Sequence, residues 1–338
     1  MTTSIVILNW NGEKFLQQFL PTLIENTPKS DVEIIVADNA STDGSMEMMK
    51  EKFPLIRTVV LDENYGFAAG YNKALAQIES DYYILLNSDV EVSPFWLEPL
   101  VEYMNNHLEV AACQPKILSF VDKSLFEHAG ASGGFIDKYG FPFCRGRIFG
   151  NAEKDNGQYE NIVDVFWATG ACLMIRSTAY WSVGGLDDDF FAHMEEIDLC
   201  WRLKSRGHRI VCVPQSTVYH VGGGTLNTES PHKVFLNFRN NLFLLYKNLP
   251  VKELDKILMW RILFDYLAAF QFVVKGKFKH AKSICKARRE FKLNKNTFDQ
   301  KRKENLLYAT QCNFEEVYDG SVVFDFFVKG KRTYDKLT

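Results

Sequence analysis

Three carboxylates stand within four positions of the segment FFAHMEEIDLCWR, which covers residues 190–202. Glu195, Glu196 and Asp198 open a run whose apolar spacing predicts a helix. Carboxylates in the first turn of a helix interact favourably with the helix dipole, which partly offsets the repulsion between like charges. A carboxylate there can also take the proton of a hydroxyl group that attacks a substrate. The segment is therefore either a charged helix start or the source of a general base.

The residues before position 90 alternate between strand-like and helix-like segments. Short apolar runs rich in β-branched residues indicate strands, and apolar residues at helical spacing indicate helices. This alternation predicts an α/β fold with a mainly parallel sheet flanked by helices, whose ligands bind at the carboxyl ends of the strands. The expected strands are 4–10, 32–38, 57–63 and 82–89, and the expected helices are 13–26, 41–53 and 66–80.

Polar residues recur where these strands end. Asp38 directly follows an apolar strand and is a candidate to accept a hydrogen bond from a ligand, whereas Asp43 is expected to cap a helix. Asn, Asp, Ser and Gly are also ordinary residues of turns and caps, so a purely structural role stays open. The residues at the strand ends are Asn9, Trp10, Asn11, Asp38, Asn39, Asn64, Gly66, Asn87, Ser88 and Asp89.

The segment YYILLNSDVEV suggests how a phosphate-bearing ligand could be bound. The chain has neither a GxxxxGK[ST] motif nor a GxGxxG motif after its first strand, so a P-loop or a classical dinucleotide site is not expected. Asn87 and Asp89 instead offer amide and carboxylate oxygens, which a hard divalent cation accepts while it keeps water or phosphate ligands. The alternative is an ordinary turn at the end of a strand.

The motifs, taken in order, resemble the family 2 glycosyltransferases. The resemblance rests on VILNWNG, VADNASTDGS, ENYGFAAGYNKAL, LLNSDVEV, ATGACLMIR and GGLDDDFFAHMEEIDLCWRLKSRGHRI, and it spans roughly residues 4–245. It implies a GT-A fold, a nucleotide-sugar donor linked to UDP or dTDP, a divalent cation (Mn²⁺ or Mg²⁺) and transfer with inversion at the anomeric carbon. The chain looks most like the rhamnosyltransferase-like enzymes that build bacterial surface polysaccharides, for which dTDP-rhamnose would be a donor.

The resemblance also assigns roles to the acidic segment. The second acid of the family's paired-acid motif is the base, and that position is Glu196 here. Glu195 would orient the acceptor or the loop, and Asp198 would be structural. The family often has aspartate where this chain has Glu196, and the extra methylene moves the carboxylate by about 1.5 Å.

Two histidines have two interpretations each. His220 follows a predicted strand and precedes glycines, and in some relatives a histidine at the matching place binds the metal, which would put His220 beside Asp89. Alternatively, His220 is a structural residue that is held by hydrogen bonds. His193 could contact the acceptor or pack against Phe190 and Phe191.

Carried over to this sequence, the resemblance gives two sets of binding residues. Arg239, in a helix predicted after the second glycine-rich turn, would reach a diphosphate, or else be an exposed residue of a docked helix. The turn at Gly222 is expected to close over the donor, and the turn at Gly184 is left open between closure and a simple connection. The donor set is Asn9, Asn11, Asp38, Asn64, Gly66, Asn72, Asn87, Ser88 and Arg239, and the acceptor set is Glu195, His193, Thr169 and Gly170.

A change in composition marks the C-terminal region. We expect a catalytic domain at 1–245, with a donor half at about 1–115 and an acceptor half at about 116–245, followed by a helical, basic appendage at 246–338. The apolar stretch 257–274 contains Arg261 and Asp265, which makes it a poor membrane-spanning helix. It is either a helix packed on the catalytic domain or an interfacial helix whose basic continuation, to about residue 295, meets anionic lipids of the inner leaflet.

Composition limits the remaining alternatives. The 338 residues include 39 basic and 42 acidic ones, which gives a net charge of -3 and no overall attraction to nucleic acid. Seven cysteines without CxxC spacing and a start without a secretion signal suggest the cytoplasm. The expected function is transfer of a sugar to a hydroxyl of a glycan or lipid-linked glycan. A metal-dependent nucleotide-sugar hydrolase and a noncatalytic nucleotide-sugar-binding module are the alternatives.

Overall fold

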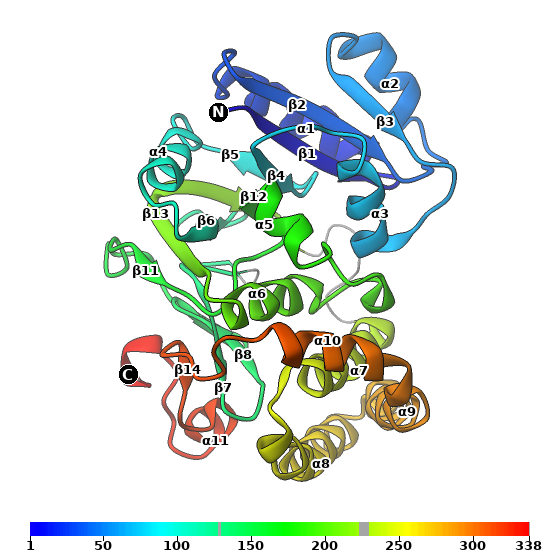
Figure 1. The fold of residues 1–338 in the computed structure, drawn as a ribbon, viewed down its shortest axis with the longest axis vertical. Helices are drawn as coiled ribbons and strands as arrows, with labels where there is room; N and C mark the ends of the chain where they lie inside the picture. Colours follow the sequence, from blue (N-terminus) through cyan, green and yellow to red (C-terminus); the bar gives the residue numbers. More distant parts are fainter. Residues whose placement is uncertain (128–129, 223–229, 338) are drawn as a thin grey trace.

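The computed structural model describes residues 1–127, 130–222 and 230–337, and its centre is a nine-stranded mixed sheet (Figure 1). The strand order is β11-β13-β6-β12-β4-β1-β2-β3, and β5 pairs with β13. The strands are β1 (Thr3–Asn9), β2 (Val32–Asp38), β3 (Arg57–Val60), β4 (Tyr82–Leu86), β5 (Val90–Val92), β6 (Val110–Ser119), β11 (Val163–Asp164), β12 (Cys172–Arg176) and β13 (Arg209–His220).

The first half of the sheet confirms the predicted alternation. β3, β2, β1 and β4 are parallel neighbours, and the register places Asn9 opposite Asp38 at the carboxyl ends of β1 and β2. The helices between them are α1 (Glu13–Glu25), α2 (Ser45–Lys52) and α3 (Gly66–Leu75), and α4 (Glu98–Asn106) follows β5.

Both faces of the sheet are buried, as expected for strands that read as continuous apolar runs. Ile5 and Ile7 point to one side, where they join a core that includes Leu16 of α1 and Leu100 of α4. Val6 points to the other side and joins a core built with α3, α5 (Ser177–Ser182) and α6 (Glu195–Ser205).

The second half of the sheet explains how distant residues reach the site. β12 runs antiparallel between β4 and β6, and β13 is parallel to β6. β5 pairs antiparallel with β13 so that His220 lies opposite Val90. His220 is therefore the last residue of a strand, not part of the loop that the sequence suggested, and it is a neighbour of Asp89.

A second, smaller sheet was not predicted. Its order is β10-β9-β8-β7-β14, and β14 near the C-terminus is parallel to β7. The region 246–338 thus contributes a strand as well as helices to the folded body. The strands are β7 (Gly134–Asp137), β8 (Pro142–Cys144), β9 (Arg147–Ile148), β10 (Asn151–Ala152) and β14 (Val317–Tyr318).

The helical region predicted at the C-terminal end is present at the lower end of Figure 1. Aromatic side chains join its helices, for example Phe243 and Phe298, whose ring centroids lie 4.3 Å apart. The helices are α7 (Pro231–Asn248), α8 (Val251–Val274), α9 (Phe278–Asn294), α10 (Asp299–Tyr308) and α11 (Val322–Phe327), with short 3₁₀ turns at Asp188–Phe190, Lys295–Phe298 and Tyr334–Lys336.

Candidate active site

Asp89 and His220 meet at one edge of the large sheet. Asp89 Oδ1 lies 3.2 Å from His220 Nε2, and both side chains are buried. Glu127 Oε2 lies 3.1 Å from the other ring nitrogen, Nδ1. The amide nitrogen of Asn87 is 3.5 Å from His220 Nε2. The structure therefore brings together the two metal ligands that the resemblance proposed and adds a second carboxylate behind the histidine.

The two carboxylates control the charge of His220. Burial lowers the pKa of the imidazole, but hydrogen bonds and charges from Asp89 and Glu127 outweigh burial and raise it to about 10. A cation bound at Nε2 would displace the proton there, while a proton on Nδ1 could still be donated to Glu127. Sequence reasoning missed Glu127, because nothing in its local segment SLFEHAG marks it.

Asn9, Asp38 and Ser41 form a hydrogen-bonded group at the ends of β1 and β2. Asn9 Nδ2 donates to Asp38 Oδ1 at 3.0 Å and to Ser41 Oγ at 3.1 Å, and the Ser41 backbone N–H donates to Asp38 Oδ2 at 2.9 Å. Both oxygens of Asp38 thus accept bonds within the protein. Asn9 Oδ1 is buried and has no hydrogen-bond partner among the described residues, which leaves it available to a ligand.

Two other residues of the predicted donor set shape turns. Asn11 has a positive φ of 54°, and its Oδ1 accepts the backbone N–H of Thr42 at 2.7 Å. Asn64 Oδ1 accepts a bond from Gly66 N at 2.9 Å and one from the side chain of Asn39 at 3.0 Å. Asp43, predicted to cap a helix, accepts the backbone N–H of Ser45, the first residue of α2.

Gly66 connects the donor side with the acidic loop. Its φ is +75°, and a Cβ there would lie 2.5 Å from the ring of Phe191, so a larger residue would clash. The next backbone N–H, that of Phe67, donates to the carbonyl of Phe191 at 2.8 Å. Asn72 also crosses to this loop, because its Nδ2 donates to the carbonyl of Leu186 at 2.7 Å.

Glu195 and Glu196 begin α6 beside the turn at Thr169 and Gly170. A Cβ built on Gly170 would lie 3.9 Å from Glu196 Cβ and 3.2 Å from the ring of Phe67. The Thr169 backbone N–H donates to Gln114, and its hydroxyl accepts the N–H of Ala171, so this turn is held in place from inside. The Ala171 carbonyl in turn accepts the backbone N–H of Asn87 at 3.0 Å, which ties this turn to the segment after β4 that contains Asp89.

Burial makes the acidic pair unusual. Glu195 is buried and Glu196 is partly exposed, and one oxygen of each carboxylate, Oε2, is enclosed without a hydrogen-bond partner among the described residues. Burial, followed by the charge of Glu196, raises the pKa of Glu195 well above its usual range. Burial also raises the pKa of Glu196, although backbone N–H groups of the helix start oppose this. A raised pKa makes a carboxylate a stronger base, which suits Glu196 to accept a proton from a hydroxyl group.

The acidic loop is held by α7. Phe191, His193 and Met194 have positive φ values of 64°, 71° and 75°, which is a strained conformation for residues other than glycine. Asn240, which is fully buried, donates through Nδ2 to the carbonyls of Phe190 at 2.9 Å and of Ala192 and His193 at 2.8 Å each. This clamp fixes the start of α6 and hence Glu196.

Arg239 supports the same clamp. Its Nε donates to Asn240 Oδ1 at 2.9 Å, and its Nη2 donates to the Phe190 carbonyl at 3.3 Å. It is therefore neither exposed nor detached from the acidic loop. The sequence marked both Arg239 and Asn240 as polar residues among apolar positions of the predicted helix, but it suggested a binding role only for Arg239. The glycine-rich loop expected to close over the donor has residues 223–225 outside the described part of the chain.

We expect Glu195→Gln to stabilise the protein at neutral pH. In the folded protein the carboxyl has a raised pKa, so its contribution to stability is complete below the unfolded pKa and is lost as pH rises through the folded pKa. Glutamine removes that loss, which grows by about 1.4 kcal/mol per pH unit between an unfolded pKa of about 4.3 and the raised folded pKa. Urea unfolding from pH 4.5 to 8 measures the effect, and a gain that is the same at every pH would contradict it.

Asp198 belongs to a separate, buried ion network. Its Oδ2 accepts Arg202 Nε and Lys247 Nζ, each at 2.8 Å, and its Oδ1 accepts the Asn248 amide at 2.8 Å. Lys247 also pairs with Asp187 at the start of the acidic loop. These contacts agree with the structural role expected for Asp198.

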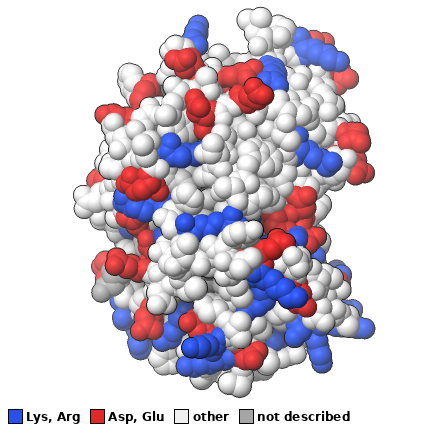
Figure 2. Space-filling view, in the orientation of Figure 1, with Lys and Arg blue, Asp and Glu red and all other residues white. Residues whose placement is uncertain are grey.

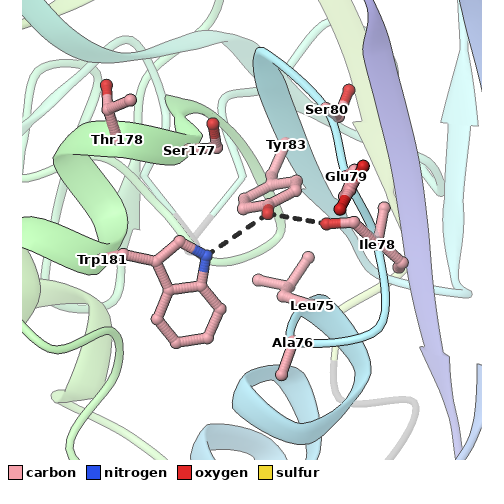
Figure 3. Close-up of a pocket in the computed structure, with 9 residues that line it drawn as sticks. All are labelled: Leu75, Ala76, Ile78, Glu79, Ser80, Tyr83, Ser177, Thr178 and Trp181. Atoms are coloured by element: carbon pink, nitrogen blue, oxygen red, sulfur yellow. Dashed lines mark hydrogen bonds between the residues drawn. The ribbon is translucent and has the colours of Figure 1, made fainter.

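A hollow on another part of the surface carries none of these residues. It lies near the amino-terminal end of β4 and is lined by parts of α3 and α5 (Figure 3). Tyr83 closes its floor, because its hydroxyl donates to the Ile78 carbonyl at 2.9 Å and accepts the Trp181 indole N–H at 3.3 Å. Asp89 follows the opposite, carboxyl end of β4, so this hollow is not part of the candidate active site.

Comparison with known proteins decides the family. The model of the family "Glycosyl transferase family 2" matches residues 4–184. This chain belongs to that family. It is therefore a glycosyltransferase, and the resemblance seen in the sequence is confirmed.

Two curated relatives match over most of their length. The N-acetylglucosaminyl-diphospho-decaprenol L-rhamnosyltransferase of Mycobacterium tuberculosis is 28% identical over 232 residues, which are 64% of this chain and 75% of that protein. The rhamnosyltransferase WbbL of Escherichia coli K12 is 24% identical over 225 residues, which are 64% of this chain and 82% of that protein.

Solved structures confirm the fold. Staphylococcus aureus TarS 1–349 in complex with UDP-GlcNAc has a TM-score of 0.57 at 15% identity and aligns over 95% of this chain and 99% of that one. GalNAc-T7 with UDP, GalNAc and Mn²⁺ has a TM-score of 0.59 at 14% identity and aligns over 88% and 57%. The GT-A fold expected from the sequence is thus confirmed for this glycosyltransferase.

Proposed function

We propose that this protein is an inverting hexosyltransferase of bacterial surface polysaccharide synthesis. It would move a sugar, with rhamnose as the first candidate, from a UDP- or dTDP-linked donor to a hydroxyl of a glycan or lipid-linked glycan. The names of the two rhamnosyltransferase relatives support the reaction class and the sugar. The single structural observation that carries the proposal is the place of Glu196: this carboxylate with a raised pKa begins α6 beside a turn that is hydrogen-bonded to the segment containing Asp89.

Inversion follows from a single displacement with one base. Glu196 would accept the proton of the acceptor hydroxyl while that oxygen forms a bond to the anomeric carbon. The bond from the anomeric carbon to the diphosphate oxygen breaks at the same time, so the electron pair leaves with the nucleoside diphosphate. Glu195, Thr169, Gly170 and His193 would orient the acceptor, since Glu195 begins α6, His193 is two residues before it and Gly170 lies beside Glu196.

Asp89 and His220 would hold a divalent cation, Mn²⁺ or Mg²⁺. A carboxylate and an imidazole 3.2 Å apart suit such an ion, and Glu127 accepts at the far ring nitrogen, as partners of metal-bound histidines do. In the described part of the chain, no group of three or more His, Cys, Asp or Glu side chains could hold a metal alone. Donor phosphates and water would complete the site, and the bound cation would neutralise charge on the leaving diphosphate.

The polar residues at the strand ends would bind the donor. Asn9 offers an enclosed oxygen without a partner among the described residues, next to the paired Asp38. Ser88 and Asn9 both lie beside Gly12, and Asn87 lies 3.5 Å from His220 Nε2, so both Ser88 and Asn87 would face the donor. Asn11, Asn64, Gly66 and Asn72 would set the turns around it. Arg239 would act on the diphosphate only if it left the Phe190 carbonyl, to which it now donates. The cytoplasm, where nucleotide sugars are made, is the proposed location.

Donor binding should stabilise the protein only in the presence of the cation. We expect one UDP- or dTDP-sugar to raise Tm with Mn²⁺ or Mg²⁺, because a ligand at one hundred times its Kd adds about 2.7 kcal/mol of stability. Asp89→Ala and His220→Ala should remove the cation-dependent part of the shift. A thermal-shift panel of nucleotide sugars measures this, with Asp62→Ala as the control for a lost surface charge. No shift with any donor would contradict the proposed donor class.

A further inference from the structure

Helix α8 buries charged side chains and exposes apolar ones, which is the opposite of an ordinary surface helix. Arg261 and Asp265 are 2% and 0% exposed, whereas Phe270 and Val274 on the same helix are 65% and 69% exposed. At about 100° per residue, the exposed apolar side chains cover one continuous arc of about 160°. They are Met259, Trp260, Ile262, Leu263, Tyr266, Leu267, Phe270, Val273 and Val274.

The buried charges of α8 are satisfied within the protein. Arg261 donates to Asp265 Oδ1 at 3.1 Å and also to the side-chain oxygen of Asn241 on α7. Arg288 on α9 lies 2.5 Å from Asp265 Oδ2. The two charges that interrupt the apolar sequence therefore attach the helix to the folded body and leave an apolar outer arc between residues 259 and 274.

The neighbouring helix α9 supplies a basic border. Between residues 275 and 295 the chain has nine Lys or Arg residues and one Glu. Lys279, Lys282, Lys286, Arg289 and Lys292 are exposed. Lysine and arginine side chains gather at this end of the molecule, the lower end in Figure 2.

A groove between α8 and α9 combines the two kinds of surface. Its apolar wall includes Met259, Ile262 and Tyr266, and its basic wall includes Arg289 and Lys292. Apolar side chains that border lysines and arginines are typical of helices that lie in the interface of an anionic membrane. The charge of the groove and its apolar wall therefore complement a phospholipid, with its acidic headgroup and its acyl chains.

We propose that the α8–α9 hairpin, Val251–Asn294, docks flat on a bilayer that contains anionic phospholipids. By length and composition α8 could also cross a membrane. Crossing would take Arg261 and Asp265 into lipid and pull α8 away from the C-terminal elements, whereas β14 pairs with β7 and Lys301 of α10 lies 2.7 Å from Asp189 in the acidic loop. The folded arrangement thus fits a helix that lies on the surface.

This docking adds a membrane partner to the proposed function, and its role in sugar transfer depends on that proposed function. Asn240 of α7 clamps the acidic loop, and the adjacent Asn241 accepts from Arg261 of α8. One helix therefore connects the docking surface with the loop that positions Glu196. The acceptor side of the site would be held near the lipid surface, where a lipid-linked glycan presents its hydroxyl.

Vesicle co-sedimentation of the full chain, without donor or acceptor, tests the docking. We expect binding to phosphatidylcholine vesicles that contain phosphatidylglycerol, weaker binding as salt increases, and little binding to phosphatidylcholine alone. The triple variant Leu263→Gln, Leu267→Gln and Phe270→Gln should lose at least about tenfold in partitioning, because only exposed apolar side chains are removed. Its matched control is Leu55→Gln, Leu108→Gln and Val121→Gln, whose parent side chains are exposed elsewhere.

Two matched charge-reversal variants test whether binding depends on the basic residues of α9 or only on the net charge of the protein. Lys279→Glu, Lys282→Glu and Lys286→Glu should lower binding to anionic vesicles at least about tenfold. The same change at Lys14, Lys29 and Lys303, which are exposed on other elements, should have a much smaller effect. Equal losses in both sets would overturn the assignment to α9.

Two further outcomes would overturn the docking. One is unchanged vesicle binding by the glutamine triple variant. The other is a dimer in light scattering that this variant converts to a monomer, since the apolar face would then be covered by a second copy. Donor binding in the thermal-shift panel is measured separately, so failed docking with intact donor binding would leave the proposed function in place. Intact docking with no donor binding would support the docking and contradict the proposed function.

Discussion

Glu196→Gln should slow sugar transfer by about 10³-fold while leaving the donor bound. Glutamine has nearly the same size as glutamate but cannot accept the hydroxyl proton, and general base catalysis contributes about 10²- to 10⁴-fold to a rate. We therefore expect kcat to fall by about 10³-fold. The cation-dependent thermal shift with the donor should stay as in the unchanged protein, because Asp89 and His220 are untouched. A radiolabelled transfer assay and the thermal shift, run on the same preparation, measure both quantities.

The control for this variant is another glutamate of a first helical turn. Glu47 lies in the first turn of α2 and is exposed, so Glu47→Gln repeats the change away from the site. It should leave kcat within about twofold, as expected for a surface substitution. Retained transfer by Glu196→Gln would remove Glu196 as the base, and a lost thermal shift would mean that the variant had damaged donor binding instead.

The pH dependence of transfer follows from the same carboxyl group. Burial raises the pKa of Glu196, so the base becomes protonated at a higher pH than an ordinary glutamate with a pKa of about 4.3. As pH is lowered, we expect kcat to begin to fall at a pH above about 4.3, the usual pKa of a glutamate. The residual activity of Glu196→Gln should not show this fall.

The local sequence pattern was sufficient to predict the strands and helices of the donor half. Val36, Ala37 and Asp38 are read correctly as the end of a strand because adjacent residues alone decide that β2 is apolar and where it stops. The same holds for the paired acids, whose helix begins at Glu195. The second sheet escaped prediction because strands such as Arg147–Ile148 are too short for any alternation to show.

The parts of the site that escaped prediction depend on long-range packing. Glu127 and His220 are 93 positions apart; they meet because the Glu127 backbone N–H donates to Ile117 on β6, which is a neighbour of β13. Asn240 lies in a predicted helix, but its three carbonyl partners are 47 to 50 positions away. The inward direction of Arg261 and Asp265 was within reach of the sequence, since their spacing of four puts them on one helix face.

The roles assigned to single residues remain predictions. Their hydrogen bonds indicate which residues are better candidates for direct contact with a ligand. Asn9 and Glu196 each have an enclosed oxygen without a partner among the described residues, as a ligand or substrate would require. Asn72 instead accepts from Tyr180 at 2.5 Å and donates to Asp188 at 2.6 Å. Its hydrogen bonds within the protein favour a positioning role over direct contact with the donor.

Lys247→Met should cost more stability than any other single change in the acidic loop and its supports. The Lys247 ammonium lies 2.8 Å from Asp198 Oδ2 and also pairs with Asp187, and all three side chains are buried. Burial alone would raise the pKa of Asp187, but the charges of Lys247 and Lys301 outweigh it and hold the pKa well below its usual range. Removing one partner of a buried ion pair costs about 3–5 kcal/mol, because the remaining charge stays buried.

Lys301→Met supplies a matched control at the same carboxylate. Lys301 Nζ lies 2.5 Å from Asp187 Oδ1, but its side chain is 39% exposed, so water screens the pair and its loss should cost about 1 kcal/mol or less. Urea unfolding of both variants at pH 7 gives the comparison. Equal losses would show that burial does not decide the strength of these pairs.

Acid should reduce the difference between Lys247→Met and the unchanged protein. A carboxylate with a lowered folded pKa contributes stability above its unfolded pKa of about 3.9, and that contribution is lost as pH falls through the folded pKa. Without Lys247, Asp187 should take up a proton at a higher pH, which removes the buried charge and its cost. The double variant Lys247→Met with Asp187→Asn should recover part of the stability at pH 7. No recovery would mean that Lys247 acts mainly through its cation–π contact with Phe190, whose ring centroid lies 5.1 Å from Nζ, and not through its pairing with Asp187.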